Sequence, residues 1–385
     1  MLRNVLLGLC LVLLGILLGW NTYQQRLLSR MESQKFIPLS HPDIAIRDTL
    51  DDGGYSEQYG LHHRPYCNFW SDAHSHTYSA EVPQQVRNKW LLDMRRAKYE
   101  INIVNGVVFC KTEEDLQLVV DSLPNHAPVW WASIYDPDIG KLREYKERYG
   151  IKGVKIYYAT LVYAEARGDT MEFPVGSGKM VPVSIDMAIA PEWMEFYRVC
   201  EELDLPISCH SNVRLGPAYY NFGGDGRKIY SKLTYDNFYI ISHVEKILTA
   251  FPKLRYVLCH QGFMGPPQLD KYFAKYPNLF VDTSAGMILH DGDYLTDAER
   301  EIYRSLLIKW PDRFLFGTDS GVLWIAPEGQ TEEWGLRRMV YQLIYPTKNF
   351  IMALQLPQDV LSKVAHRNFE RVFNMPQSST EDWPD

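Results

Sequence analysis

The feature that most constrains this chain is a regular alternation of short apolar segments with helical segments, repeated across residues 66–375. Eight apolar segments read as strands, with the third expected over 129–135, the sixth over 254–260 and the eighth over 313–319. Alternating strands and helices predict a parallel sheet, because parallel neighbours need a crossover connection. Eight such units predict a (β/α)8 TIM barrel with insertions. A doubly wound open sheet is the alternative, although no glycine-rich phosphate-binding motif follows the first strand.

Five side chains with metal-binding chemistry stand at the ends of predicted strands. The first strand ends in FWSDAHSH, residues 69–76, where alternation puts His74 and His76 on the same face. Such a pair alone is more often structural than metal-binding. Later strands end at His210, His260 and Asp319. Since a TIM barrel carries its active site at the carboxyl ends of its strands, we expect all five side chains to converge there.

These motifs resemble those of the amidohydrolase superfamily. The chain is most similar to the amidohydrolase-related branch that includes aminocarboxymuconate-semialdehyde decarboxylase and related hydrolases and decarboxylases. The resemblance rests on DAHSH at 72–76, ISCH at 207–210, VLCHQG at 257–262 and LFGTD at 315–319. The closing LPQD and NFERVF segments, within 356–373, are also similar to that branch. The order of the four motifs is specific for the superfamily but says little about substrate.

The resemblance implies one divalent metal ion, with zinc expected, bound by His74, His76, His210 and Asp319. His260 would then lie beside the ion without being a primary ligand. The chemistry of the residues agrees, because three neutral imidazoles and one carboxylate leave a position open for water, as in catalytic sites. Asp319 and His260 are the expected catalytic residues. Asp319 can accept and return the proton of that water, and His260 can hydrogen-bond the water or polarise the substrate oxygen.

Two basic residues are candidates for binding an acidic group of the substrate. Lys155 lies in GVKIYY, residues 153–158, and shares a strand face with Tyr157. We expect Lys155 to bind a carboxylate of the substrate or to balance buried carboxylates. The alternative is a carbamylated lysine that bridges two metals, as in some members of the superfamily. Arg214 follows His210 in a long loop on the expected catalytic face and is the second candidate.

Three functions follow as hypotheses. The leading one is hydrolysis of a C–N or C–O acyl bond of a small molecule by metal-activated water. The second is non-oxidative decarboxylation of an aromatic or enol carboxylate. The third is a membrane-tethered, non-catalytic binding protein on a barrel without turnover. The oligomeric state stays open, with a homodimer among the alternatives.

The N-terminus differs from the rest of the chain. Residues 5–20, VLLGLCLVLLGILLGW, contain no charged side chain and would span roughly 24 Å as a helix. We expect residues 1–24 to form a single-pass membrane anchor, with a cleaved signal peptide and a buried helix as alternatives. Residues 25–65 would be a tether, 66–375 the amidohydrolase-like domain and 376–385 a polar tail. The side of the membrane that carries the catalytic domain stays open.

Net charge and cysteine spacing argue against a nucleic-acid-binding protein and against a disulfide-stabilised fold. The formal net charge is −7, which argues against a nucleic-acid-binding protein because such proteins need a basic face. The six cysteines form no Cys-x-x-Cys motif and no spacing typical of a disulfide framework. We therefore expect a small-molecule enzyme whose cysteines are mainly buried packing residues.

Overall fold

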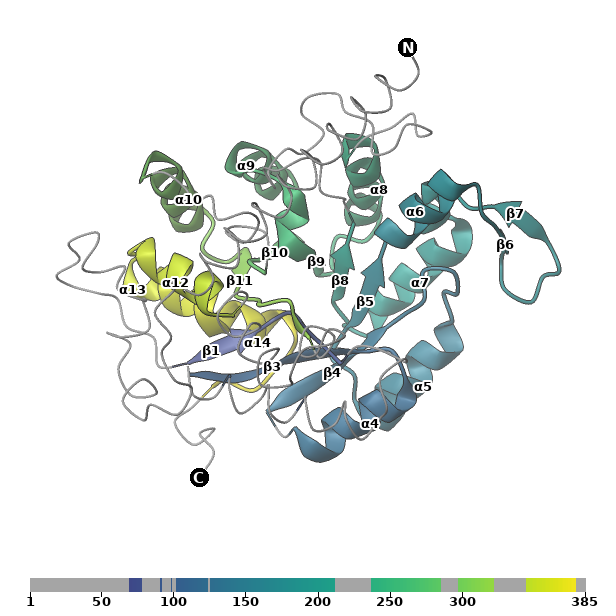
Figure 1. The fold of residues 1–385 in the computed structure, drawn as a ribbon, viewed down its shortest axis with the longest axis horizontal. Helices are drawn as coiled ribbons and strands as arrows, with labels where there is room; N and C mark the ends of the chain where they lie inside the picture. Colours follow the sequence, from purple (N-terminus) through teal and green to yellow (C-terminus); the bar gives the residue numbers. More distant parts are fainter. Residues whose placement is uncertain are drawn as a thin grey trace, which may run out of the picture. The chain divides into compact units, whose positions relative to one another are not determined.

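The computed structural model describes residues 69–77, 91, 98, 102–123, 125–211, 237–284, 297–321 and 344–378. In this part of the chain a ten-stranded sheet curls around a central axis, and its helices lie on the outside (Figure 1). Every strand pairing in that sheet is parallel. The ten strands are β1 (Trp70–Asp72), β2 (Ser75–His76), β3 (Ile103–Cys110), β4 (His126–Trp131), β5 (Val154–Tyr157), β8 (Ile207–His210), β9 (Tyr256–Leu258), β10 (Leu279–Asp282), β11 (Phe314–Leu315) and β12 (Ser320–Gly321).

The ten strands fill eight positions, because the first and last positions are each interrupted. β1 and β2 both pair with β3. On the far side β11 pairs with β10, while β12 pairs with β2. Residues 314–321 thus form the eighth strand position and join the seventh strand, β10, to the first position, so the barrel closes. Ala73 N donates to Phe316 O at 2.8 Å where the first and eighth positions meet. The TIM-barrel-like architecture is confirmed, and the open-sheet alternative is wrong.

Helices follow the strands around the barrel, and local sequence sets their ends. The Thr112 side chain accepts from Asp115 N, and Asp138 accepts from Lys141 N, so each caps a helix start. Gly150, at φ 62°, takes the left-handed conformation that ends α5. The helices are α4 (Glu113–Ser122), α5 (Ile139–Tyr149), α6 (Ala159–Arg167), α7 (Pro191–Glu202), α8 (Asn237–Ala250), α9 (Pro266–Lys275), α10 (Asp297–Lys309), α12 (Tyr345–Ala353), α13 (Gln358–Ser362) and α14 (Asn368–Val372).

The amino end of the barrel is closed by the last helix. Phe369 and Phe373 are fully buried against interior residues such as Val107 and Phe280. Asn368 donates to the carbonyls that precede and begin β11, at Pro311 and Phe314, both at 2.8 Å. The apolar core thus lies at this end, which leaves the carboxyl ends of the strands for the site.

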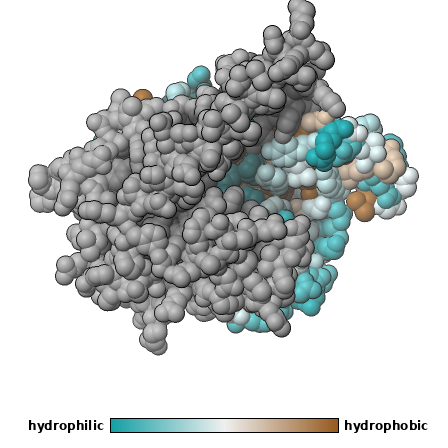
Figure 2. All heavy atoms as spheres, viewed as in Figure 1, coloured by the Kyte–Doolittle hydropathy of each residue, from teal (hydrophilic) through white to brown (hydrophobic). Residues whose placement is uncertain are grey.

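The segment after β5 carries most of the irregular structure. It contains α6, the antiparallel pair β6 (Thr170–Glu172) and β7 (Met180–Pro182), and the short helix η1 (Ile185–Ile189). The β6–β7 hairpin projects from the barrel (Figure 1), and hydrophobic patches interrupt a largely hydrophilic surface there (Figure 2). This segment lies between β5 and α7 and is one of the insertions into the barrel.

None of the described helices is long and apolar enough to cross a membrane. The predicted anchor, residues 1–24, and the predicted tether, residues 25–65, lie outside the described residues. The predicted domain boundaries stay predictions.

Candidate active site

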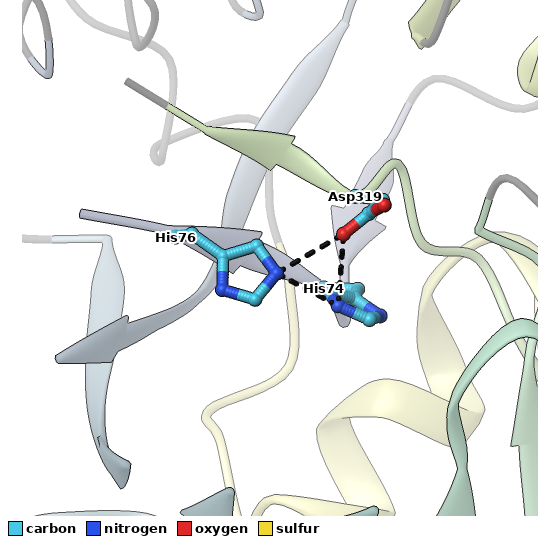
Figure 3. A group of neighbouring side chains, drawn as sticks. All are labelled: His74, His76 and Asp319. Atoms are coloured by element: carbon cyan, nitrogen blue, oxygen red, sulfur yellow. Dashed lines mark hydrogen bonds and ion pairs between the residues drawn. The ribbon is translucent and has the colours of Figure 1, made fainter. Parts of the chain in front are cut away.

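Three of the predicted ligands meet at the carboxyl end of the barrel. His74 Nε2 lies 3.0 Å from His76 Nε2 and 3.2 Å from Asp319 Oδ1, and His76 Nε2 lies 3.0 Å from the same oxygen. Figure 3 shows the two imidazoles and the carboxylate turned toward one another. Both histidines are buried, whereas the Asp319 side chain is 18% exposed. The carboxylate is therefore the part of this group that opens to solvent.

This trio has the donor chemistry of a divalent metal site. Two imidazole nitrogens and a carboxylate oxygen all present lone pairs, which repel at these distances unless a cation or a proton lies among them. Ligand atoms bound at ~2.0–2.1 Å to one tetrahedral ion stand about 3.3 Å apart, close to the observed spacings. His74, His76 and Asp319 thus fit one divalent ion, and each side chain offers one ligand atom.

The β10 strand orients His74 from behind. Asp282 Oδ2 accepts from His74 Nδ1 at 2.8 Å, and the Ser284 hydroxyl lies 2.9 Å from that nitrogen. The Ser284 hydroxyl itself donates to Asp282 Oδ1. A carboxylate on Nδ1 fixes the imidazole tautomer and directs the Nε2 lone pair at the metal position. Asp282 was not among the predicted site residues, although a carboxylate at the end of the seventh strand was a usable signal.

His260 is held in a complementary way. Its Nδ1 lies 3.0 Å from the carbonyl oxygen of Ser284, which can only accept, so the ring proton is on Nδ1. Its backbone N donates to Asp282 Oδ1 at 2.9 Å. The neutral ring therefore keeps an Nε2 lone pair, and His260 lines the same cavity as the trio. This leaves it able to accept a proton or a hydrogen bond.

Unusual backbone conformations concentrate at these residues. His260, Gln261, Gly262 and Phe263 are consecutive residues with φ between 54° and 61°, and Asp319 has φ 56°. Left-handed conformations cost non-glycine residues energy and recur at functional sites. His260 thus belongs to the turn η2 (Cys259–Phe263) and not to the strand, and Asp319 belongs to the break between β11 and β12.

Asp72 ties the two ligand-bearing segments together. Its Oδ1 accepts from His74 N at 3.0 Å and from Thr318 N at 2.9 Å, and its Oδ2 accepts from the Thr318 hydroxyl at 2.6 Å. Lys98 completes the shell with an ion pair at 2.5 Å. Gly317 allows the approach, since a Cβ there would lie 3.1 Å from His74 Cβ. Asp72 therefore fixes His74 and Asp319 relative to each other.

His210 lies in the same cavity but outside the tight trio. Its ring stands 4.7 Å from the His260 ring and 4.5 Å from the Tyr157 ring, between centroids. Among the described residues, the groups with metal-ligand spacing are His74–His76–Asp319 and His74–His260–Asp282. In the second group, the hydrogen bond between His74 Nδ1 and Asp282 occupies the atoms a metal would need. The role of His210 as a ligand stays a prediction.

Lys155 is a buried side chain that lines the cavity. It is 1% exposed, its Nζ donates to Cys259 Sγ at 2.7 Å, and it stands 4.7 Å from the Phe109 ring centroid. Lys155 and Tyr157 both line the cavity, as the strand alternation predicted. Arg214 lies outside the described residues, so its predicted role is not tested.

Burial and charge set the protonation of the histidines. Burial lowers the pKa of His76 to about 3, and burial also lowers the pKa of His210 and His260, with a further contribution from the Lys155 ammonium in each case. These rings are therefore neutral and available as ligands or bases. Burial and Lys155 also lower the pKa of His74, but the combined charges of Cys259, Asp282 and Asp319 hold it well above 6.5. In the metal-free trio, His74 carries the proton that a cation would replace.

A cavity of about 710 Å³ opens over the trio, within the range of small-molecule sites. Aromatic rings form one wall, since Trp131 lies 5.2 Å from the His76 ring and 6.2 Å from the Tyr157 ring, between centroids. Lys111 and Tyr135 also line it. Lys111 and Trp131 were not among the predicted site residues. Both stand at or next to the ends of strands, so their positions were a usable signal.

The barrel and the trio of His74, His76 and Asp319 at its carboxyl end together define a TIM-barrel metal-dependent enzyme. A model of the amidohydrolase family matches residues 106–375, and the chain belongs to this family. No curated protein matches the sequence.

Several solved structures are similar to this chain. A dihydroorotase from Campylobacter jejuni is 15% identical, with 81% of this chain and 85% of that chain covered and a TM-score of 0.45. A probable 2-pyrone-4,6-dicarboxylic acid hydrolase from Acinetobacter baumannii is 14% identical over 80% and 100%, at 0.41. A dihydroxybenzoic acid decarboxylase from Polaromonas sp. JS666, with bound manganese and 2-nitroresorcinol, is 13% identical over 82% and 99%, at 0.47.

Proposed function

We propose that this chain is a metal-dependent hydrolase that cleaves a C–N or C–O acyl bond of a small molecule. The observation that carries the proposal is the position of Asp319, whose carboxylate shares the donor trio and is also open to the cavity. A divalent ion held by His74, His76 and Asp319, with His210 as the fourth expected ligand, would supply Lewis acidity and lower the pKa of water at the site. Zinc is the expected ion.

The protein side chains would then move the proton. Nearby histidines keep the pKa of Asp319 well below 3.8 despite the opposing effect of burial, so the group is a carboxylate at neutral pH. Asp319 accepts the proton of the attacking water and delivers it to the leaving group. His260 presents Nε2 to the same cavity and hydrogen-bonds the water. The positive charge of Lys155 adds to the effect of burial in lowering the pKa of His76, His210 and His260.

A second candidate is non-oxidative decarboxylation of an aromatic or enol carboxylate. The aromatic wall of Trp131 and Tyr157, together with the two lysines of the cavity, supports this alternative. In that reaction Asp319 or His260 would deliver a proton to the substrate carbon.

The test is a turnover screen with the full chain loaded with Zn²⁺ or Mn²⁺. The panel contains esters, lactones, amides and cyclic amides, together with hydroxybenzoates as carboxylate substrates. Release of a product acid without carbon dioxide supports the hydrolase, and Asp319→Asn is the matched inactive control. Carbon dioxide release would replace it with the decarboxylase. Stoichiometric metal without turnover of any compound would indicate the non-catalytic binding protein.

We also propose that residues 1–24 anchor the enzyme in a membrane as a single-pass segment, from the uncharged run at residues 5–20. The full chain should stay in the membrane fraction after an alkaline carbonate wash, and a variant lacking residues 1–24 should leave it. A full chain found in the supernatant with its N-terminus intact would contradict the anchor. A mature N-terminus beyond residue 20 would indicate a cleaved signal peptide.

A further inference from the structure

Lys155 of β5 and Cys259 of the turn η2 form a very close contact, although they lie 104 positions apart along the chain. The Lys155 Nζ lies 2.7 Å from the Cys259 Sγ. Sulfur is a larger atom than oxygen, and the Cys110 thiol donates to its carbonyl partner, Val108 O, at 3.3 Å. The nitrogen and sulfur atoms of Lys155 and Cys259 are therefore closer than a hydrogen bond to sulfur requires.

No carboxylate competes for this lysine in the described part of the chain. Lys155 and Cys259 are both 1% exposed, and the second neighbour of the ammonium group is the Phe109 ring, 4.7 Å away at its centroid. Buried charges in proteins are normally paired with an opposite charge. The fold thus holds a buried amine directly against a thiol, with only an aromatic ring beside them.

A small oxidant can reach this pair from the cavity over the donor trio. Lys155 lines that cavity, and so does His260, which directly follows Cys259 in the chain. Peroxide oxidises a cysteine to a sulfenic acid, which then reacts with a nearby thiol or nitrogen. At Cys259 the nearby nitrogen is the Nζ of Lys155.

We propose that Lys155 and Cys259 are an oxidative modification site, at which hydrogen peroxide joins Nζ and Sγ through one bridging oxygen atom. The ammonium group first releases a proton to solvent. One N–H bond and the S–H bond then break, and an N–O bond and an O–S bond form. One amine, one thiol and two molecules of hydrogen peroxide give the N–O–S link and three molecules of water, so the peroxide accepts all the electrons that the side chains lose.

The geometry favours this link over a direct bond between nitrogen and sulfur. Two single bonds that meet at a bent oxygen hold their outer atoms about as far apart as Nζ and Sγ already lie, so neither strand has to move. A direct bond would have to draw the two atoms much closer together. The link joins β5 to the turn that carries His260 and removes the positive charge of Lys155 from the cavity. It involves no residue of the donor trio and does not depend on the proposed hydrolase activity.

The test treats the metal-free full chain with hydrogen peroxide and maps its peptides by mass spectrometry. Free thiols are alkylated, and the protein is digested without reductant. We expect a cross-linked pair of peptides that contains Lys155 and Cys259. Its mass should equal the sum of the two peptides plus one oxygen and minus two hydrogens. Dithiothreitol should release both peptides unmodified.

Matched variants separate this pair from general oxidation. Cys259→Ser and Lys155→Arg should each lose the cross-linked peptides. Cys200→Ser removes another fully buried thiol that takes no part in the contact, so it should keep them. The urea midpoint of the treated, unmodified sequence should exceed that of the reduced protein, because the link closes a long loop of the unfolded chain. Cys259→Ser should show no such increase.

Three results would overturn the modification site. A cross-linked pair without the added oxygen would indicate a direct bond between sulfur and nitrogen. Cys259 found as a sulfinic acid or in a disulfide, with Lys155 unmodified, would show that the amine does not trap the oxidised sulfur. The third result is an unmodified Cys259 at peroxide doses that convert Met180, which is 62% exposed, to its sulfoxide.

Discussion

The two ends of the barrel solve opposite physical problems. At the amino end, Phe369 and Phe373 of α14 are fully buried against apolar residues and need only shape complementarity. At the carboxyl end, His74 and Asp282 are equally buried but polar, and each is hydrogen-bonded. Burial of polar groups is costly unless partners satisfy them, so this end depends on a specific network.

Backbone conformation differs in the same way. Asp319 and most residues of the turn around His260 take left-handed conformations without being glycine. In α14 the described residues are regularly helical and continue from the π-helical segment η5 (Lys363–Arg367). The comparison indicates that the amino end stabilises the barrel, while the carboxyl end holds strained and charged groups in place for chemistry.

The largest expected effect is at the carboxyl end. Asp319→Asn removes the proton acceptor, and turnover should fall by about 10²–10⁴-fold. His74→Ala removes one nitrogen of the trio and should abolish stoichiometric metal retention after dialysis. Activity assays and elemental analysis check the two outcomes. Small and equal effects of both substitutions on turnover and metal would contradict the site.

At the amino end, Phe373→Ala should cost about 3–5 kcal/mol of unfolding free energy, because it leaves a cavity in a fully buried cluster. Chemical denaturation of the metal-loaded protein measures this loss. Metal affinity of the folded fraction should be unchanged. A large change in metal affinity would show that the two ends are coupled more tightly than the comparison states.

Asp282→Asn tests the hydrogen bond that orients His74 at the carboxyl end of the barrel. The variant keeps the shape of the side chain but loses the charge that faces His74 Nδ1, and metal affinity should fall about 10–100-fold. Competition with a chelator measures the affinity. Asp270→Asn, on helix α9 with its side chain 38% exposed, is the matched control and should leave the metal affinity unaltered. An Asp282→Asn protein that keeps full affinity would reduce this carboxylate to a packing role.

The smallest effect concerns Glu370, a charged residue of the apolar end. Burial raises its pKa, but hydrogen bonds from His366 and Ser378 outweigh burial and hold the pKa below 4.5. A lowered pKa stabilises the fold above pH ~4.5 and loses this contribution as pH falls through the folded-state value. Glu370→Gln should therefore cost about 1 kcal/mol at pH 7. In chemical denaturation, the variant should be less stable than the unmodified protein at pH 7 and equally stable at pH 3. The same loss of stability at both pH values would contradict an ionic origin.

Much of the fold was predictable because its signals are local. Strand β5 (Val154–Tyr157) lies within one residue of the bounds of the GVKIYY segment, residues 153–158, since burial in a parallel sheet leaves a clear apolar pattern. The third strand was misplaced: β4 begins at His126 and ends at Trp131, because its ladder with β3 begins opposite Gly106. Residues 132–135, expected as strand, instead line the cavity.

The site was predictable in part for the same reason. Alternation along the expected first strand predicted that His74 and His76 would lie together, although the structure interrupts that strand at residues 73–74. The position of Asp319 at the end of the eighth segment followed from the barrel. The turn at His260 was not predictable, because a run of left-handed residues contradicts local preference and persists only where surrounding contacts hold it. No local pattern indicates that Asp72 contacts Thr318, because the two residues lie far apart along the chain.

The sequence by itself determined the order of strands and helices, the family motifs and the types of side chain available for metal chemistry, because these depend on local pattern. The tertiary structure decided which of those side chains meet. Closure of the barrel brings β12 beside β2, so Asp319 contacts His74 and His76. It also sets Asp282 behind His74 and Lys111 over Trp131, contacts between strands that no local pattern encodes.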